Sequence, residues 1–158
     1  MKILLLADEC NPEWPSLPIV GWKYAKSIAE GAQIVLATHV RNRENIEKEA
    51  HGLDIRYIDT EWLAGPMFRL ARWLRGGEEV AWSTSMMMNY LPYLAFEHGV
   101  YRHFGGDLSD FDIVHRITPT SPTLPSWIAH KCRQPFVIGP LHGNLDWPTA
   151  FTAEQARE

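Results

Sequence analysis

Hydrophobic residues along the chain fall into short unbroken runs, separated by polar segments rich in proline and glycine. The first run, Ile3 to Ala7, follows Lys2 and ends at Asp8. A strand that is apolar on both faces is typical of the centre of a parallel sheet, because helices cover both sides of such a sheet. The pattern therefore predicts a central parallel strand at the start of the chain.

The same pattern predicts the other elements. Apolar runs indicate three further strands, and an alternating segment, 54–59, indicates a half-exposed edge strand. The predicted buried strands are Gln33 to Thr38, Phe111 to Ile117 and Pro135 to Gly139. Helical spacing predicts helices over 22–32, 42–50, 85–104 and 126–133, the first beginning directly after Gly21. The helix over 85–104 is apolar on several faces, so we expect it to be buried and kinked at Pro92.

Strands and helices alternate along the chain, which is the order of a parallel α/β sheet. At 158 residues the chain is most simply one domain, 1–158. Composition is 46% hydrophobic and 22% charged, close to globular averages. We therefore predict the α/β class, a Rossmann-like three-layer sandwich with a central parallel sheet.

The segment Pro66 to Arg75 reads as an amphipathic helix with a basic face formed by Arg69, Arg72 and Arg75. Such a helix can lie on an anionic membrane surface. The alternative, which the pattern favours, is an ordinary surface helix packed on the sheet.

Charge and cysteine content exclude some functions. A net charge of −4 argues against a general nucleic-acid binder, which normally has a basic face. The two cysteines form no CxxC, which favours a reduced, cytoplasmic setting, although one distant disulfide stays an alternative. No run approaches the roughly 20 apolar residues of a membrane-spanning helix.

Common catalytic and nucleotide motifs are missing. The sequence contains no G-x-G-x-x-G after the first strand, no phosphate-binding P-loop and no G-x-S-x-G elbow. Spacings typical of metal ligands are also absent, so we expect neither a metal nor a bound cofactor.

Loops that follow parallel strands meet at one edge of the sheet, where such sheets bind ligands. Three of these loops contain chemically useful residues: Gly21, His115 and His142. Helix amides beside Gly21 could receive a phosphate, and a strand-end histidine could act as a base or hydrogen-bond donor. Each residue also has a possible structural role. Gly21 could serve turn geometry alone, and either histidine could anchor a loop or the core. For His115 this structural role is the favoured one.

The segments Asp110 to Trp127 and Pro135 to Asn144 read DFDIVHRITPTSPTLPSW and PFVIGPLHGN. Together they resemble the N-terminal half of family 4 glycosyltransferases, retaining enzymes with the two-domain GT-B fold. The shared pattern is D-[IV]-[IV]-H, a loop with Pro and Thr, and a strand that ends in G-P-x-x-G. The first strand and its delayed glycine, Gly21, fit the same resemblance.

The resemblance implies an acceptor-binding domain whose first loop meets the phosphates of a nucleotide-sugar donor. It implies donor contact at Gly21 and catalytic contact at His115 and His142. It further implies an acceptor site at Asp8, Arg116, Thr118, Gly143 and Asn144. The sequence departs from the family where Ile117 replaces a second histidine, and where the glycine-rich run is reduced to 142–144.

Family members hold the donor mostly in a C-terminal domain that carries two glutamates spaced E-x7-E. No two glutamates in this chain are eight positions apart. Thr152 and Gln155 form a capping-box pattern that predicts a helix start close to the end of the chain. We therefore expect the donor-binding domain to lie on a longer chain or on a partner subunit.

The sequence thus predicts the acceptor-binding domain of a retaining glycosyltransferase that is inactive alone. Its expected partners are a nucleotide sugar, a hydroxyl-bearing acceptor and the missing domain, with peripheral membrane contact as a further interpretation. Two alternatives remain: a stand-alone binding or regulatory domain, and another nucleotide-binding α/β enzyme, such as a hydrolase that uses Asp8 and the histidines.

Overall fold

A computed structural model describes residues 1–49, 52–63, 65–66 and 82–142, the first eight of the last range by their backbone alone. The strands are β1 (Lys2–Ala7), β2 (Gln33–His39), β3 (Asp54–Ile58), β4 (Ile113–Thr118) and β5 (Phe136–Ile138). The helices are α1 (Leu17–Ala29), α2 (Arg43–Glu49) and α4 (Trp82–His103), with 3-10 turns η1 (Val40–Asn42) and η2 (Ile128–Lys131).

The five strands form one sheet in the order β3-β2-β1-β4-β5, with every neighbouring pair parallel. β1 lies at the centre, where Leu4 pairs with Val35 on one side and Val114 on the other. The predicted parallel sheet and its central first strand are confirmed, as is β3 at an edge.

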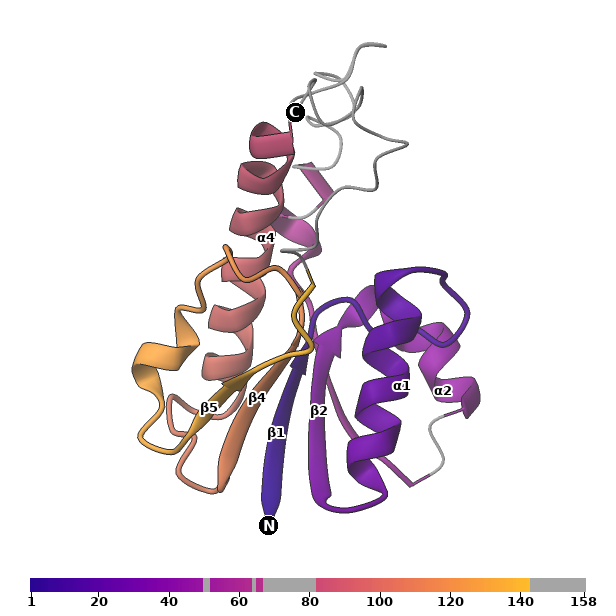
Figure 1. The fold of residues 1–158 in the computed structure, drawn as a ribbon, viewed down its shortest axis with the longest axis vertical. Coiled ribbons are helices and arrows are strands. Elements are labelled where there is room, and N and C mark those ends of the chain that lie inside the picture. The colour runs from indigo at the N-terminus through magenta and orange to yellow at the C-terminus, as the bar shows by residue number, and fades with distance from the viewer. Residues whose placement is uncertain (50–51, 64, 67–81, 143–158) are drawn as a thin grey trace, which may run out of the picture.

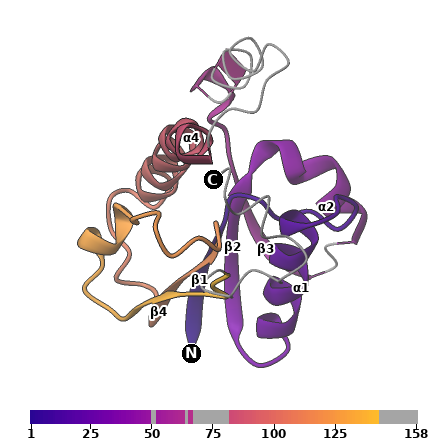
Figure 2. The same ribbon diagram turned by 45° about the horizontal axis from the view of Figure 1, so that its top comes forward.

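Helices cover both faces of the sheet, giving three layers (Figures 1 and 2). Alternate residues of β1 point to opposite sides, because successive side chains of a strand alternate. Leu4 and Leu6 pack with Phe96 of α4, whereas Leu5 packs with Trp22 of α1. Figure 1 shows the first residue at one end of β1, and α1 and α2 beside the face opposite α4. The predicted three-layer sandwich is therefore confirmed.

Four details of the sequence prediction are wrong. Of the helix predicted over 126–133, the structure contains only the 3-10 turn η2. α1 begins at Leu17 rather than after Gly21, because Pro18 fits the first turn of a helix, where its missing N–H costs nothing. From Tyr90 onward α4 is buried on one face only, and Leu91 is an exposed residue on it. β5 is the outermost strand of the sheet that the structure describes, and its side chains are exposed, with Val137 40% and Ile138 42% accessible.

Several predicted features lie outside the described residues. These are the basic face of Arg69, Arg72 and Arg75, the capping-box pair Thr152 and Gln155, and Gly143 and Asn144. Within the described ranges, no helix is long and apolar enough to cross a membrane. Cys10 and Cys132 are both free thiols, and burial raises the pKa of Cys10 to about 12.

Candidate functional site

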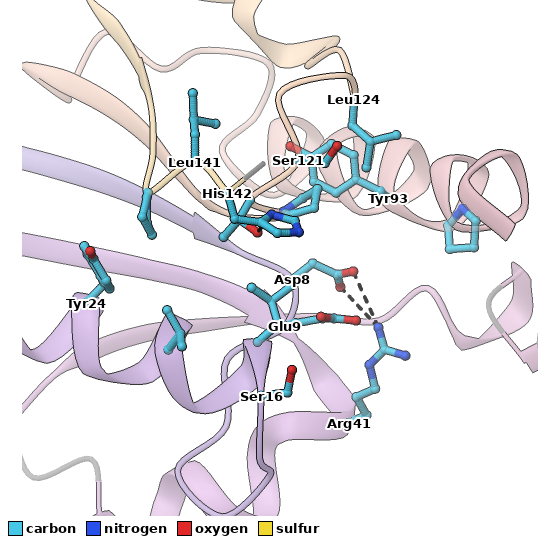
Figure 3. Close-up of a pocket in the computed structure, with 16 residues that line it drawn as sticks. Asp8, Glu9, Ser16, Tyr24, Arg41, Tyr93, Ser121, Leu124, Leu141 and His142 are labelled. Carbon is cyan, nitrogen blue, oxygen red and sulfur yellow. Dashed lines mark hydrogen bonds and ion pairs between the residues drawn. The ribbon is translucent and has the colours of Figure 1, made fainter. Parts of the chain in front are cut away.

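A cavity of about 610 Å³ lies at the carboxyl edge of the sheet. Its walls come from the loop after β1, the first turns of α1, the loop after β4 and the segment after β5 (Figure 3). Polar side chains in the wall include Asp8, Glu9, Arg41, Thr120 and His142. The sequence predicts that the loops after the parallel strands meet at one edge of the sheet and bind a ligand there. The structure has a cavity at that edge.

Two asparagines fix the loop after β1. The amide of Asn42 donates to the Asp8 carbonyl at 2.8 Å and to Thr38 Oγ1 at 2.9 Å. The backbone N–H of Asn11 donates to the Pro18 carbonyl at 2.9 Å, which ties the loop to the first turn of α1. These hydrogen bonds therefore fix the backbone on which the Asp8 carboxyl group stands.

The side chains of Asp8 and Arg41 point toward each other in the wall of the cavity (Figure 3). The Arg41 guanidinium lies 3.5 Å from both carboxylate oxygens, and the Asp8 side chain is 13% exposed. Burial raises the pKa of Asp8 to about 6, with the attraction of Arg41 opposing the rise and the charge of Glu9 adding to it. Burial also raises the pKa of Glu9. The site therefore holds two adjacent carboxyl groups that take up protons more readily than exposed ones.

His39 supports the residue that carries this guanidinium. The backbone N–H of Arg41 donates to His39 Nδ1 at 3.2 Å, so Nδ1 is an acceptor and Nε2 carries the proton toward Thr60 Oγ1, 3.0 Å away. Burial, with the nearby charge of Arg41, lowers the pKa of His39 to about 4. Although Glu61 Oε1 lies 3.7 Å from Nδ1, the neutral ring forms no ion pair there.

Thr118 joins the ends of the two central strands. Its hydroxyl donates to the Glu9 carbonyl and accepts the Glu9 N–H, both at 3.1 Å. The β1–β4 register shifts at this point, since Leu6 pairs with Arg116 and Ala7 with Thr118. Thr118 is fully buried and does not line the cavity, so it positions Glu9 in this structure.

Gly21 lies inside α1, where a Cβ atom would stand 2.4 Å from the Glu9 carbonyl oxygen. A glycine is thus required by the close approach of helix and loop. The structure accounts for Gly21 by packing, and its predicted contact with a phosphate stays a prediction.

Arg116 is fully buried behind the cavity. Its guanidinium donates to the carbonyls of Leu124 at 2.6 Å and Ser121 at 3.0 Å, and to Ser126 Oγ at 3.0 Å. These bonds hold the loop after β4, whose Ser121 and Leu124 line the cavity. Arg116 therefore shapes the wall and lies outside the lining residues.

Glu97 of α4 completes this buried network. One carboxylate oxygen accepts the N–H groups of Trp127 at 2.6 Å and Ile128 at 3.2 Å, and the other accepts the Tyr93 hydroxyl. Tyr93 also lies 3.1 Å from Ser126 Oγ, so the α4 and β4 sides of the network meet there.

The two predicted histidines occupy different places. His142 lines the cavity, and its Nδ1 lies 2.7 Å from Thr120 Oγ1. His115 does not line it: it pairs with Leu5 of β1, whose side chain lies on the α1 side of the sheet, and its Nε2 donates to the Gly139 carbonyl at 2.8 Å. The alternative of a loop-anchoring histidine matches this contact. Asp8 and His142 are thus brought to one cavity, whereas His115, Arg116 and Thr118 support it.

Sequence reasoning missed Glu9, Arg41, Thr120 and the Tyr93–Glu97 pair. Glu9 and Thr120 stand in the loops that were singled out, so their position was a usable signal. Arg41 lies beyond the end of β2, next to β1 in the sheet, and the strand order would have pointed to it. Glu97 sits in an apolar helix, where a lone carboxylate indicates a buried hydrogen-bond network.

Among the residues that the structure describes, no group of three or more His, Cys, Asp or Glu is placed to bind a metal ion. No protein-family model matches the chain, and neither does any curated protein or solved structure.

Proposed function

We propose that the chain is the acceptor-binding domain of a retaining glycosyltransferase that uses a nucleotide-sugar donor. The observation that carries the proposal is the single cavity formed by the loops after β1, β4 and β5. Those are the segments in which the sequence resembles family 4 glycosyltransferases. The parallel three-layer sheet is also the architecture that this resemblance implies.

The polar wall suits a ligand with several hydroxyl groups. The carboxylates of Asp8 and Glu9 accept hydrogen bonds from hydroxyls, and Thr120 and His142 can take either role. Asp8 is paired with Arg41, which keeps its carboxyl group oriented. In this proposal these residues bind and orient the acceptor.

His142 is the better candidate of the two histidines for contact with the transferred sugar. Its ring is exposed in the cavity wall, whereas the His115 ring would first have to leave the Gly139 carbonyl. We therefore assign His115 to the support of the segment that leads to His142.

The test is sugar transfer by the complete gene product, alone and with a co-expressed partner. Radiolabelled nucleotide sugars are incubated with a panel of hydroxyl-bearing acceptors, and the expected result is transfer with retention at the anomeric carbon. His142→Ala should reduce the rate by roughly 100-fold, because losing a contact that orients the transferred sugar misplaces the reacting groups. The matched control is His130→Ala, an exposed histidine outside the cavity.

A complete gene product that binds sugars and transfers none in any combination would contradict the enzyme proposal. The same result would favour the second candidate, a stand-alone binding domain. That candidate is supported by the cavity itself, which needs no second domain to bring Asp8, Thr120 and His142 together.

A further inference from the structure

The helix α1 carries two separate apolar stripes. Trp22 and Ala25 lie on the first and pack against the sheet. Leu17, Val20 and Tyr24 lie at spacings of three and four residues on the second, so they share another face of the helix. All three line the cavity, and Tyr24 is 44% exposed. The second stripe therefore has no role in the core and faces the ligand space.

Apolar residues also stand on the opposite wall. Leu124, Pro119, Pro140 and Leu141 line it, and Leu141 is 54% exposed. Figure 3 shows Tyr24 at one side of the cavity and Arg41 at the other, with Leu141 across from the α1 stripe. The cavity is thus divided into an apolar part beside α1 and a polar part beside Asp8, Glu9 and Arg41.

Charge in the polar part limits the kind of group that fits. Of the lining residues that the structure describes, Arg41 alone is a lysine or arginine, and its guanidinium is paired with Asp8. Asp8 and Glu9 supply two carboxyl groups against that one cation. A phosphate or carboxylate placed there would meet two like charges, whereas hydroxyl groups would find hydrogen-bond acceptors.

We propose that the ligand of this cavity is amphipathic, with an uncharged polyol head beside Asp8 and Glu9 and an alkyl or aryl tail along Leu17, Val20 and Tyr24. This inference rests on the proposed function, because it identifies the polyol head with the sugar-like acceptor. The cavity volume of about 610 Å³ is within the range of pockets that take drug-sized ligands, so it has room for a tail as well as a head.

The experiment measures the affinity of the full chain for three probes below their micelle concentrations: methyl β-D-glucopyranoside, octyl β-D-glucopyranoside and octyl phosphate. We expect the octyl glucoside to bind at least about tenfold more tightly than the methyl glucoside, because each buried methylene contributes a factor of roughly three to four. We expect octyl phosphate to bind at least about tenfold more weakly than the octyl glucoside, because of like-charge repulsion.

Two exposed aromatic residues provide a matched pair of variants. Tyr24→Ser should weaken octyl glucoside binding about threefold or more and leave the methyl glucoside unchanged. Trp62→Ser is the control, because Trp62 is 72% exposed and lies in a different groove, between β3 and α4. Circular dichroism of both variants checks that the fold is kept.

Equal affinity for the methyl and octyl glucosides would overturn the tail assignment and leave the sugar site intact. A Trp62→Ser loss as large as that of Tyr24→Ser would place the tail outside the cavity and overturn it too. Octyl phosphate binding as tightly as the glucoside would overturn the head assignment. Failure of both glucosides to bind would overturn the inference together with the acceptor site, whereas absent sugar transfer with intact octyl glucoside binding would overturn only the enzyme proposal.

Discussion

At the scale of single residues, the cavity depends on titratable groups whose protonation is shifted in opposite directions. Asp8 has its pKa raised to about 6, and His39, two residues before Arg41, has its pKa lowered to about 4. Burial is the first cause of both shifts, because it disfavours the charged form of either group. Their effects on stability therefore have opposite signs over the same pH range.

The signs follow from proton binding. Asp8 binds its proton more tightly in the folded than in the unfolded protein, so its contribution to stability is full below about pH 4 and is lost as pH rises to about 6. His39 binds its proton more weakly when folded, so its contribution is full above about pH 6.5 and is lost as pH falls to about 4. The two contributions largely cancel between pH 4 and 6.5.

Asp8→Asn should remove the pH-dependent contribution of Asp8 to stability and leave that of His39. We expect the free energy of unfolding at pH 7 to rise by up to about 3 kcal/mol, with the gain shrinking to near zero at pH 4, since two pKa units correspond to about that energy. Urea denaturation at a series of pH values measures it. Asp54→Asn, in an exposed pair with Arg56, is the control. A pH-independent difference for Asp8→Asn would contradict the explanation.

At the scale of elements, two contacts set how α1 and the loop after β4 frame the cavity. The first is the approach of α1 to the loop after β1 at Gly21. The second is the set of hydrogen bonds from the Arg116 guanidinium to two carbonyls of the loop after β4. Neither residue lines the cavity, and both position residues that do.

Gly21→Ala tests the first contact. Alanine is favoured over glycine in a helix by roughly 1 kcal/mol, but its Cβ would meet the Glu9 carbonyl oxygen at 2.4 Å. We expect the overpacking to dominate and the protein to lose about 1–3 kcal/mol of unfolding free energy. Gly31→Ala, where no atom lies within 4 Å, should change it by less than about 0.5 kcal/mol. Unfolding in urea compares them, and a stabilised Gly21→Ala protein would refute the packing argument.

Arg116→Lys tests the second contact. Lysine keeps the charge but cannot reach two carbonyls and a hydroxyl in one fork, so buried acceptors lose their partners. We expect a loss of about 3 kcal/mol or more in thermal unfolding, against less than about 0.5 kcal/mol for Arg56→Lys on the exposed surface. Equal melting temperatures for the two variants would show that the Arg116 hydrogen bonds contribute little to stability.

The sequence predicted strands well and element ends less well. Runs such as Ile3 to Ala7 are apolar on both faces, which is typical of a central parallel strand. A glycine resembles a helix boundary in the sequence, whereas Pro18 is compatible with the first turn, so α1 begins before Gly21. The exposure of β5 is not visible in the sequence, because an apolar run does not reveal how much of the two faces of a strand is covered.

At the scale of the whole molecule, the sheet order explains which parts of the site the sequence could predict. Asp8 and His142 follow predicted strands, so parallel pairing alone brings them to one edge. Arg41 and Tyr93 reach the same cavity through the position of β2 beside β1 and of α4 over the opposite face. Those placements depend on strand order and helix packing, which hydrophobic periodicity does not determine.

Hydrogen exchange should report this order directly. β1 is paired on both sides and fully covered, so its amides from Ile3 to Ala7 should exchange only through global unfolding. β5 has three residues, lies at the edge of the described sheet and has exposed side chains, so its amides should exchange faster, by roughly tenfold or more, through local opening. Mass spectrometry or NMR after dilution into D₂O measures the rates. Slower exchange in β5 than in β1 would contradict the strand order.

The direction of β1 also decides how the protein can be handled. Met1 is exposed at the amino end of β1, where Figure 1 marks the start of the chain. The cavity lies beyond the carboxyl end of the strand. A fluorophore, a biotin or a biosensor surface attached at Met1 would therefore be separated from the cavity by the length of the strand. Such attachment gives an orientation in which every tethered molecule presents its cavity to the solution.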